Sequence, residues 1–139
     1  MLLLDNSAWS HLNSEHLDEE RRTEIMDLMT RGVIATCLPF LLEAGYSAQS
    51  AASHSTMMAN FERLPRVPVT PVVEERALQA QRELAAVGHH RLAPLDIMIA
   101  ACAHEADAGV LHYDRDYDVL AARTTLEFSS EWVAPAGSL

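Results

Sequence analysis

The chain has 139 residues, 49% of them hydrophobic, and a formal net charge of −10 at pH 7. This length and apolar content predict one domain over residues 1–139 and exclude a disordered segment. No apolar run approaches the roughly 20 residues that a membrane-spanning helix needs, and the start of the chain lacks the positive region of a secretory signal, so we expect a cytoplasmic protein with no membrane contact.

The residue counts narrow the function classes further. The basic residues are ten Arg, with no Lys, against 20 Asp and Glu. A receiver domain or a P-loop nucleotidase needs a Lys near phosphate, so both are excluded. Cys37 and Cys102 are too few for a disulfide framework, and we expect both to be reduced core residues because each lies in an apolar stretch.

The first part of the chain alternates apolar runs with a helical pattern. Residues 2–5 predict a buried strand that ends on an acid, and Asn6 or Ser7 is suited to cap a short helix after it. Apolar residues at helical spacing predict an amphipathic helix over 18–31, and a second buried strand is expected over 33–37.

Prolines mark the elements in the middle of the chain. Pro39 is expected to open a mostly apolar helix that carries Glu43 one turn inside it. The stretch 47–64 is predicted to be helical. Three prolines then restrict the chain to an extended path, where a short strand is expected around residues 67–69.

The last part repeats the alternation. Helices are predicted over 70–88 and over 94–109, the second nearly all apolar except for Asp96 near its start. Strands are expected over 110–113 and in the β-prone stretch 127–133. Strands that alternate with helices predict an α/β fold: a three-layer α/β/α sandwich with a mostly parallel central sheet.

Two acids follow predicted parallel strands, Asp5 after the first strand and Asp114 after the strand 110–113. Ligands of open α/β sheets bind at the carboxyl ends of the strands, so both acids are expected at one edge of the sheet. Taken singly, Asp96 is also explained by the helix dipole, and residues 114–118 by a solvated loop. Together they predict a carboxylate cluster.

Such a cluster has a chemical consequence. Burying several carboxylates together is unfavourable because of desolvation and mutual repulsion, so a compensating cation is expected. Oxygen ligands suit Mg²⁺, with Mn²⁺ as the alternative, and a hard cation of this kind polarises phosphoryl groups and activates water. Phosphodiester hydrolysis is the reaction class that we infer.

Four segments carry a resemblance to a known family. LLLDNSAW, PFLLEAGY, HRLAPLDIMIAACA and LHYDRDYDVLA resemble, in this order, the four motifs of PIN-domain ribonucleases, and together they look like those of VapC-type toxins of type II toxin-antitoxin systems. The segments run from residue 2 to residue 121, so the resemblance covers nearly the whole chain. The last two motifs are specific, whereas the first two are weak alone.

The resemblance implies a site as well as a fold. Metal ligands would be Asp5, Asp96, Asp114 and Asp116, and the catalytic acids would be Asp5, Glu43, Asp96 and Asp114, with Glu43 completing the pocket. Which of Asp114 and Asp116 binds the metal directly stays open. Ser7 matches a polar residue that supports the site, and we expect Asp118 to face solvent. This chain departs from the common pattern at Tyr117, where Phe is usual, and at Asn6, where Thr or Ala is usual.

The resemblance also implies partners. VapC-type toxins are Mg²⁺-dependent endoribonucleases that cut structured RNA such as tRNA or rRNA, form homodimers and are inhibited by a cognate VapB-like antitoxin. A net charge of −10 suits a basic antitoxin, whose Arg would compete with metal for the acids. It suits RNA less well, so local cations are needed. The candidates for RNA contact are Arg21, Arg22, Arg31, Arg91 and Arg115.

Other residues keep two interpretations. His89 and His90 would contact RNA or assist proton transfer, or they simply belong to a polar loop. His104 and His112 are expected to be satisfied histidines of the core or a helix surface. The aromatic residues Trp9 and Tyr46 suit base stacking or a dimer interface, although core packing is the commoner use. Apolar residues of the first two helices are candidates for the dimer contact.

The sequence excludes three other kinds of binding motif, and two alternatives to a ribonuclease remain. A calcium-binding loop that starts at Asp114 would need Gly at the position of Val119 and an acid at the position of Thr125. A zinc-protease motif at His104 would need a second His at the position of Ala108. The glycines of the chain do not have the spacing of a dinucleotide-binding motif. The alternatives to a ribonuclease are a non-catalytic binding module of the same fold and a metal-dependent phosphatase for small substrates.

Overall fold

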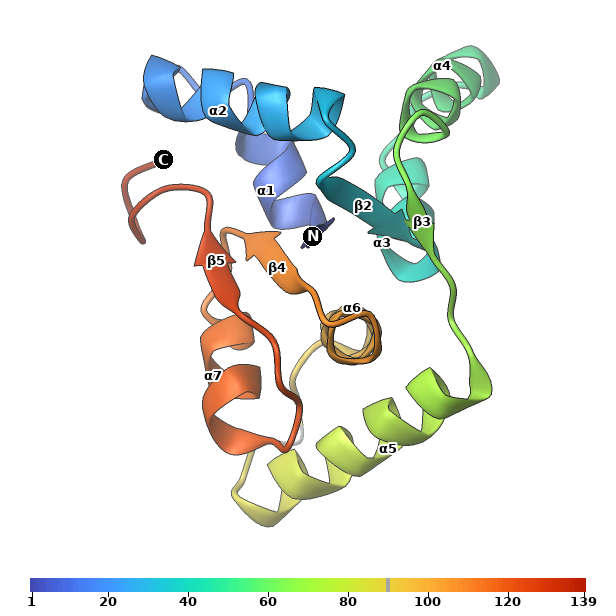
Figure 1. Ribbon diagram of the computed structural model, residues 1–139, viewed down its shortest axis with the longest axis vertical. Coiled ribbons are helices and arrows are strands. Elements are labelled where there is room, and N and C mark those ends of the chain that lie inside the picture. The colour runs from blue at the N-terminus through green and yellow to red at the C-terminus, as the bar shows by residue number, and fades with distance from the viewer. Residues whose placement is uncertain (90) are drawn as a thin grey trace.

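The computed structural model describes residues 1–89 and 91–139. Five strands and seven helices alternate along the described residues (Figure 1). The strands are β1 (Leu2–Leu4), β2 (Ile34–Cys37), β3 (Arg66–Val67), β4 (Gly109–His112) and β5 (Ser130–Trp132). The helices are α1 (Asn6–His11), α2 (Glu19–Thr30), α3 (Leu38–Tyr46), α4 (Ala51–Phe61), α5 (Pro71–Ala86), α6 (Pro94–Glu105) and α7 (Asp116–Arg123).

The strands form one sheet in the order β3-β2-β1-β4-β5, and each neighbouring pair is parallel. The prediction of an α/β fold with a mostly parallel sheet is therefore confirmed, and the sheet is parallel throughout. Leu4 of β1 is in register with Leu111 of β4, and His112 of β4 is in register with Trp132 of β5. Because all strands point the same way, the residues after β1, β4 and β5 meet at one edge.

Helices cover both faces of this sheet. In Figure 1, α2 lies on one side of the sheet, and α6 and α5 lie on the other, with α5 beyond α6. β1, β2 and β4 are buried along their whole length, which explains why their sequences are apolar runs rather than alternating patterns. α6 is buried on nearly all sides, as its composition predicts, and Asp96 is the acid in its buried stretch.

Two helix boundaries differ from the sequence prediction. The predicted helix 47–64 is shorter, since α4 begins after Ser50, whose side chain caps it in a reciprocal pair with Ser53. The helix predicted over 94–109 ends at Glu105. Asp107 makes the turn with φ of +55°, a conformation that glycine would have been expected to supply.

Gly109 instead starts β4, where a side chain has no room. A Cβ at Gly109 would contact the Oγ of Ser129 and would lie 2.9 Å from both the Ser129 carbonyl oxygen and the Leu2 Cδ2. The glycine that looked like a helix stop is thus required by close strand packing.

Within residues 1–89 and 91–139, no helix is both long enough and apolar enough to cross a bilayer.

Candidate metal centre

Five carboxylates converge at the carboxyl edge of the sheet, and each comes from a different position in the fold. Asp5 directly follows β1, and Asp114 follows β4. Glu43 lies in α3, Asp96 in the first turn of α6, and Asp116 at the start of α7. These are the five acids that the sequence singles out, and the structure brings all of them together.

The five acids form two overlapping groups. Asp5, Glu43 and Asp96 can each present one oxygen such that these oxygens lie within 4.8 Å of one another. Asp96, Asp114 and Asp116 meet the same condition. Asp96 belongs to both groups and is therefore the centre of the cluster. An all-oxygen donor set of this kind fits a hard divalent cation such as Mg²⁺ or Mn²⁺, so the cluster could hold a metal ion.

Hydrogen bonds hold Asp5 in one orientation. Its Oδ2 accepts from both the backbone N–H (2.9 Å) and the hydroxyl of Ser7, and its Oδ1 accepts from the buried Tyr117 hydroxyl at 2.6 Å. The expected cap of α1 was Asn6 or Ser7, and this prediction is wrong: Asp5 is the N-cap, since it is the last extended residue and its carboxylate reaches the first turn.

The hydrogen bonds also restrict how Asp5 can bind a cation. A carboxylate oxygen offers about two lone-pair directions, and Ser7 occupies both of those on Oδ2. Oδ1 keeps one direction beside the Tyr117 hydroxyl. Asp5 therefore has room for a single coordination bond, through Oδ1, and the Tyr117 ring fixes where that bond points.

The loop that carries Asp114 is held in a similar way. The Tyr113 N–H donates to the Ser7 hydroxyl oxygen at 2.9 Å, which ties the end of β4 to the start of α1. The Asp114 N–H donates to Nδ1 of the buried His112 at 3.1 Å, and Asp114 Oδ1 accepts from the Asp116 N–H at 2.9 Å. Both oxygens of Asp116 and one of Asp114 are left free of these bonds, so either acid could contact a cation.

The electrostatics follow from burial and crowding. The pKa of Asp96 is raised from 3.8 to about 7, first by desolvation and then by repulsion from Asp5, Asp114, Glu43 and Asp116. Desolvation and neighbouring acids also raise the pKa of Glu43 and of Asp116. The cluster thus retains protons near neutral pH unless a cation compensates its charge.

The histidines and cysteines lie as expected. Burial lowers the pKa of His112, and this neutral ring accepts the Asp114 N–H at Nδ1 while Nε2 faces the Ser130 hydroxyl at 2.7 Å. Nδ1 of His104 accepts the Glu127 N–H. Cys37 and Cys102 are buried and free. His90 lies outside the described residues, and His89 lines a shallow pocket near Asp116.

The aromatic residues differ in outcome. Trp9 packs against Phe61 at a centroid distance of 4.9 Å, as core packing predicts. Tyr46 is 91% exposed, so core packing is the wrong interpretation for it. Asp118 is exposed and stands outside both acid groups, as expected. Its carboxylate accepts from the Trp132 indole and the Ser130 hydroxyl.

Three of the five candidate arginines are already engaged. Arg21, Arg22 and Arg31 each pair with an acid of α2, and such partly exposed ion pairs contribute little energy. Arg91 lies beside Asp116 in the shallow pocket. Arg115 is exposed, and no ion pair is found for it within residues 1–89 and 91–139.

Tyr117 is the site residue that sequence reasoning missed. It was noted only as a departure from the usual Phe, yet its hydroxyl donates to Asp5 and lies 3.4 Å from an Asp96 oxygen. The signal in the sequence was a Tyr on the otherwise apolar face of a helix that starts inside an acidic motif. A buried tyrosine hydroxyl needs a polar partner, and the acids are the nearest ones.

Comparison with known proteins shows the family of this chain. The PIN-domain family model matches residues 2–123. The chain is 37% identical over 139 residues to ribonuclease VapC18 of Mycobacterium tuberculosis, covering 98% of this chain and 97% of that protein. It is 32% identical over 137 residues to ribonuclease VapC51 of the same organism, covering 99% and 96%.

Solved structures share the fold. The DNA-bound VapBC complex of Salmonella typhimurium contains a chain that superposes with a TM-score of 0.73 at 21% identity, covering 96% of this chain and 100% of that one. For VapBC2 of Rickettsia felis, bound to a promoter DNA fragment, the TM-score is 0.72 at 16% identity, covering 94% and 98%. From its family match, its VapC relatives and its fold, this chain belongs to the PIN-domain family.

Proposed function

We propose that this protein is a metal-dependent endoribonuclease and acts as the toxin of a type II toxin-antitoxin pair. The observation that carries the proposal is the convergence of five carboxylates on Asp96, whose pKa is raised to about 7 by burial and by the other four acids. Relatives that are named VapC ribonucleases and cover nearly the whole chain supply the activity class. We infer that the single domain extends over residues 1–139.

In this proposal the acids have two roles, metal binding and proton transfer. Asp5, Asp96, Asp114 and Asp116 would hold Mg²⁺, or Mn²⁺ in its place, and the ion when bound would polarise the scissile phosphate and lower the pKa of a water molecule. Ser7 and Tyr117 fix the orientation of Asp5. Glu43 is half-buried with a raised pKa, so it is suited to take a proton from the attacking water.

The proposed substrate is structured RNA such as tRNA or rRNA. The proposed partner is a basic VapB-like antitoxin, which the net charge of −10 would attract. We also propose a homodimer. Exposed apolar residues recur at every fourth position of α3, where Leu38, Leu42 and Tyr46 are 47%, 61% and 91% exposed. This stripe supports self-association through α3.

The first experiment is incubation of the purified protein with total cellular RNA, in Mg²⁺ or in EDTA. Asp96→Asn, which keeps the shape of the side chain, is the matched control. We expect discrete fragments in Mg²⁺ that are absent in EDTA and at least about a hundredfold slower to form with the variant. Intact RNA in every lane would contradict the ribonuclease and favour a non-catalytic binding module.

A phosphatase for small substrates is the remaining alternative. Hydrolysis of a nucleoside monophosphate, with RNA left intact under the same conditions, would favour it. The acids line an edge of the sheet and stand in an open arrangement with three of them half-buried, which suits a polymer substrate better than an enclosed small molecule.

A further inference from the structure

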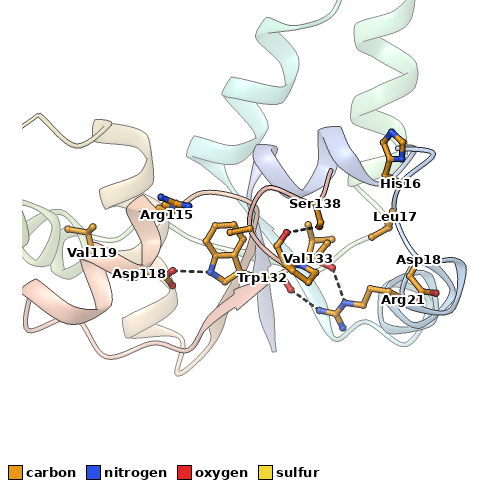
Figure 2. A pocket seen from close by; sticks show the side chains of 13 residues that line it. His16, Leu17, Asp18, Arg21, Arg115, Asp118, Val119, Trp132, Val133 and Ser138 are labelled. Atoms are coloured by element: carbon orange, nitrogen blue, oxygen red, sulfur yellow. Dashed lines mark hydrogen bonds between the residues drawn. The ribbon is translucent and has the colours of Figure 1, made fainter.

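A second concave feature lies beside the carboxylate cluster. It is an open pocket of about 990 Å³ between α2, α7 and the segment that follows β5. Figure 2 shows the Trp132 indole at its centre, between Arg115 and the C-terminal segment that carries Ser138. The wall is mainly apolar and includes Leu17, Val119 and Val133. Its size is at the upper end of the range for small-ligand sites, about 300–1,000 Å³.

The pocket and the cluster share one loop. Arg115 lines the pocket, and its two chain neighbours, Asp114 and Asp116, belong to the cluster. Trp132 is in register with His112, which is two residues before Asp114. The indole also packs edge-on against the His112 ring, at a centroid distance of 5.1 Å. The pocket therefore adjoins the loop that carries two acids of the cluster.

The acids of the pocket are occupied. Asp118 accepts from the Trp132 indole N–H at 3.0 Å and from the Ser130 hydroxyl at 2.6 Å. Asp18 caps α2 by accepting the Glu20 N–H at 2.8 Å. Because both carboxylates already have donors inside the protein, they offer little to a cationic ligand.

The cations of the pocket differ from each other. Arg21 donates to the carbonyl oxygens of Trp132 and Val133 and pairs with Glu24, as the dashed bonds to the carbonyls in Figure 2 indicate. Arg115 is exposed and has no ion pair to any residue that the structure describes. The pocket thus combines an aromatic and apolar wall with one available cation.

We propose that this pocket binds one unpaired nucleotide of the RNA, next to the phosphate that is cut. The base lies against Trp132 and the apolar wall, and Arg115 binds a phosphate of the same strand. Aromatic side chains bind unpaired bases of any sequence, and Arg matches phosphate geometry. The inference rests on the proposed ribonuclease function and adds that a base must leave its stack for productive cleavage.

Binding can be measured without cleavage. The probe is a fluorescently labelled, short single-stranded oligonucleotide of uridine and adenosine, titrated with protein in Ca²⁺ and followed by anisotropy. We expect Arg115→Gln to weaken binding by about three- to tenfold, and Trp132→Leu by about five- to a hundredfold. Arg123→Gln, which removes the same charge at the other end of α7, is the matched control and is expected to bind normally.

Trp132→Phe distinguishes a loss of base stacking from a loss of folding. It keeps an aromatic face but loses the indole N–H that bonds Asp118, so it is expected to retain most of the RNA affinity that Trp132→Leu loses. A second measurement uses the fluorescence of Trp132. The chain has two tryptophans, so Trp9→Phe leaves Trp132 as the single one. Saturable quenching of its fluorescence by the oligonucleotide, but not by inorganic phosphate, is the expected result.

The outcomes distinguish this inference from the proposed function. If Trp132→Leu and Arg115→Gln cleave RNA with unchanged kcat/KM and bind the oligonucleotide normally, the nucleotide pocket is wrong while the ribonuclease stands. If the variants bind RNA normally but lose the antitoxin, the pocket is a protein-docking site and the inference is overturned. Absence of cleavage by the unsubstituted protein, with binding still dependent on Trp132, would refute the ribonuclease and keep the pocket.

Discussion

At the scale of single residues, Asp96 determines how the protein responds to pH. Its neighbours and its burial raise its pKa from 3.8 to about 7 in the folded state, so folding favours the protonated form. The stabilising contribution of that proton is complete below about pH 4. It is lost as the pH rises to about 7, because the unfolded chain ionises first. In the absence of metal, stability therefore falls across this window.

Asp96→Asn tests this electrostatic cost. The amide cannot ionise, so in EDTA at pH 8 we expect the free energy of unfolding to rise by about 1–3 kcal/mol over the unsubstituted protein, and its decline between pH 4 and pH 7 to become shallower. Urea unfolding at several pH values measures both. Asp27→Asn, on the exposed face of α2, is the control. It loses only an exposed ion pair with Arg31, so the free energy of unfolding is expected to change by at most about 0.5 kcal/mol at each pH. A loss of stability in Asp96→Asn at pH 8 would contradict the crowding of charges.

Tyr117 acts on the same cluster without being one of the acids. Tyr117→Phe removes a buried hydroxyl that bonds Asp5 at 2.6 Å, and we expect the free energy of unfolding in EDTA to fall by about 1–3 kcal/mol. The lone-pair direction that the metal would use on Asp5 stays available. Because the hydroxyl orients Asp5, calorimetric titration with Mn²⁺ is expected to give an affinity about tenfold lower than that of the unsubstituted protein.

The comparison for Tyr117 is Asp5→Asn, which removes a proposed ligand. It is expected to weaken Mn²⁺ binding by more than tenfold while sparing the fold. If Tyr117→Phe abolished binding as fully as Asp5→Asn does, the hydroxyl would have to be treated as part of the ligand set.

At the scale of elements, apolar patterning was enough to place the strands and most helices, because buried parallel strands and amphipathic helices leave direct periodicities. It failed where a side chain from another segment decides the structure. Gly109 looked like a helix stop, and only the packing of Ser129 and Leu2 against β4 shows why it is a strand residue. Asp5 and Asp114 were predicted from their positions after strands, and the site roles of Glu43 and Asp116 came from the family resemblance. Tyr117 and the Trp132 pocket needed the fold to bring distant segments together.

The requirement at Gly109 can be measured. Gly109→Ala would push β4 away from Ser129 and Leu2, and we expect the free energy of unfolding to fall by about 2–4 kcal/mol. Adding Ser129→Ala removes the hydroxyl contact but leaves the carbonyl oxygen of residue 129 at 2.9 Å from the new Cβ. The double variant is expected to recover less than half of the loss. Full recovery would show that only the Ser129 side chain, and not the strand backbone, excludes a larger residue.

Helix ends contribute to the site as well. α1, α6 and α7 all start at the carboxyl edge of the sheet, where Asp5, Asp96 and Asp116 lie. The N-terminus of a helix favours nearby negative charge, which offsets part of the repulsion among these acids. Neither this effect nor the bonds from Ser7 and Tyr117 restores the ordinary pKa of Asp96. A bound cation would supply the remaining compensation.

At the scale of the whole molecule, the excess of acids means that NaCl and Mg²⁺ are expected to affect stability in two different ways. The net charge of −10 is screened by any salt, so NaCl is expected to stabilise the protein slightly and to do so equally in every variant of unchanged charge. Mg²⁺ adds a site-specific effect, because a cation that binds only the folded state stabilises it by mass action. Substitution of a metal ligand is expected to abolish the effect of Mg²⁺ but not the effect of NaCl.

The expected result follows from this difference. At a Mg²⁺ concentration about tenfold above its dissociation constant, the unsubstituted protein gains about 1.4 kcal/mol of unfolding free energy relative to NaCl of equal ionic strength. Asp5→Asn loses this gain, and Asp27→Asn keeps it. The gain also shrinks below pH 7, since a proton on Asp96 competes with the metal. A gain that survives Asp5→Asn but not Asp96→Asn would assign the ion to the group of Asp96, Asp114 and Asp116. A gain that survives both would mean that Mg²⁺ acts on the surface charge alone, and the carboxylate edge would then need another occupant, for which an arginine of the proposed antitoxin is the best match in charge and geometry.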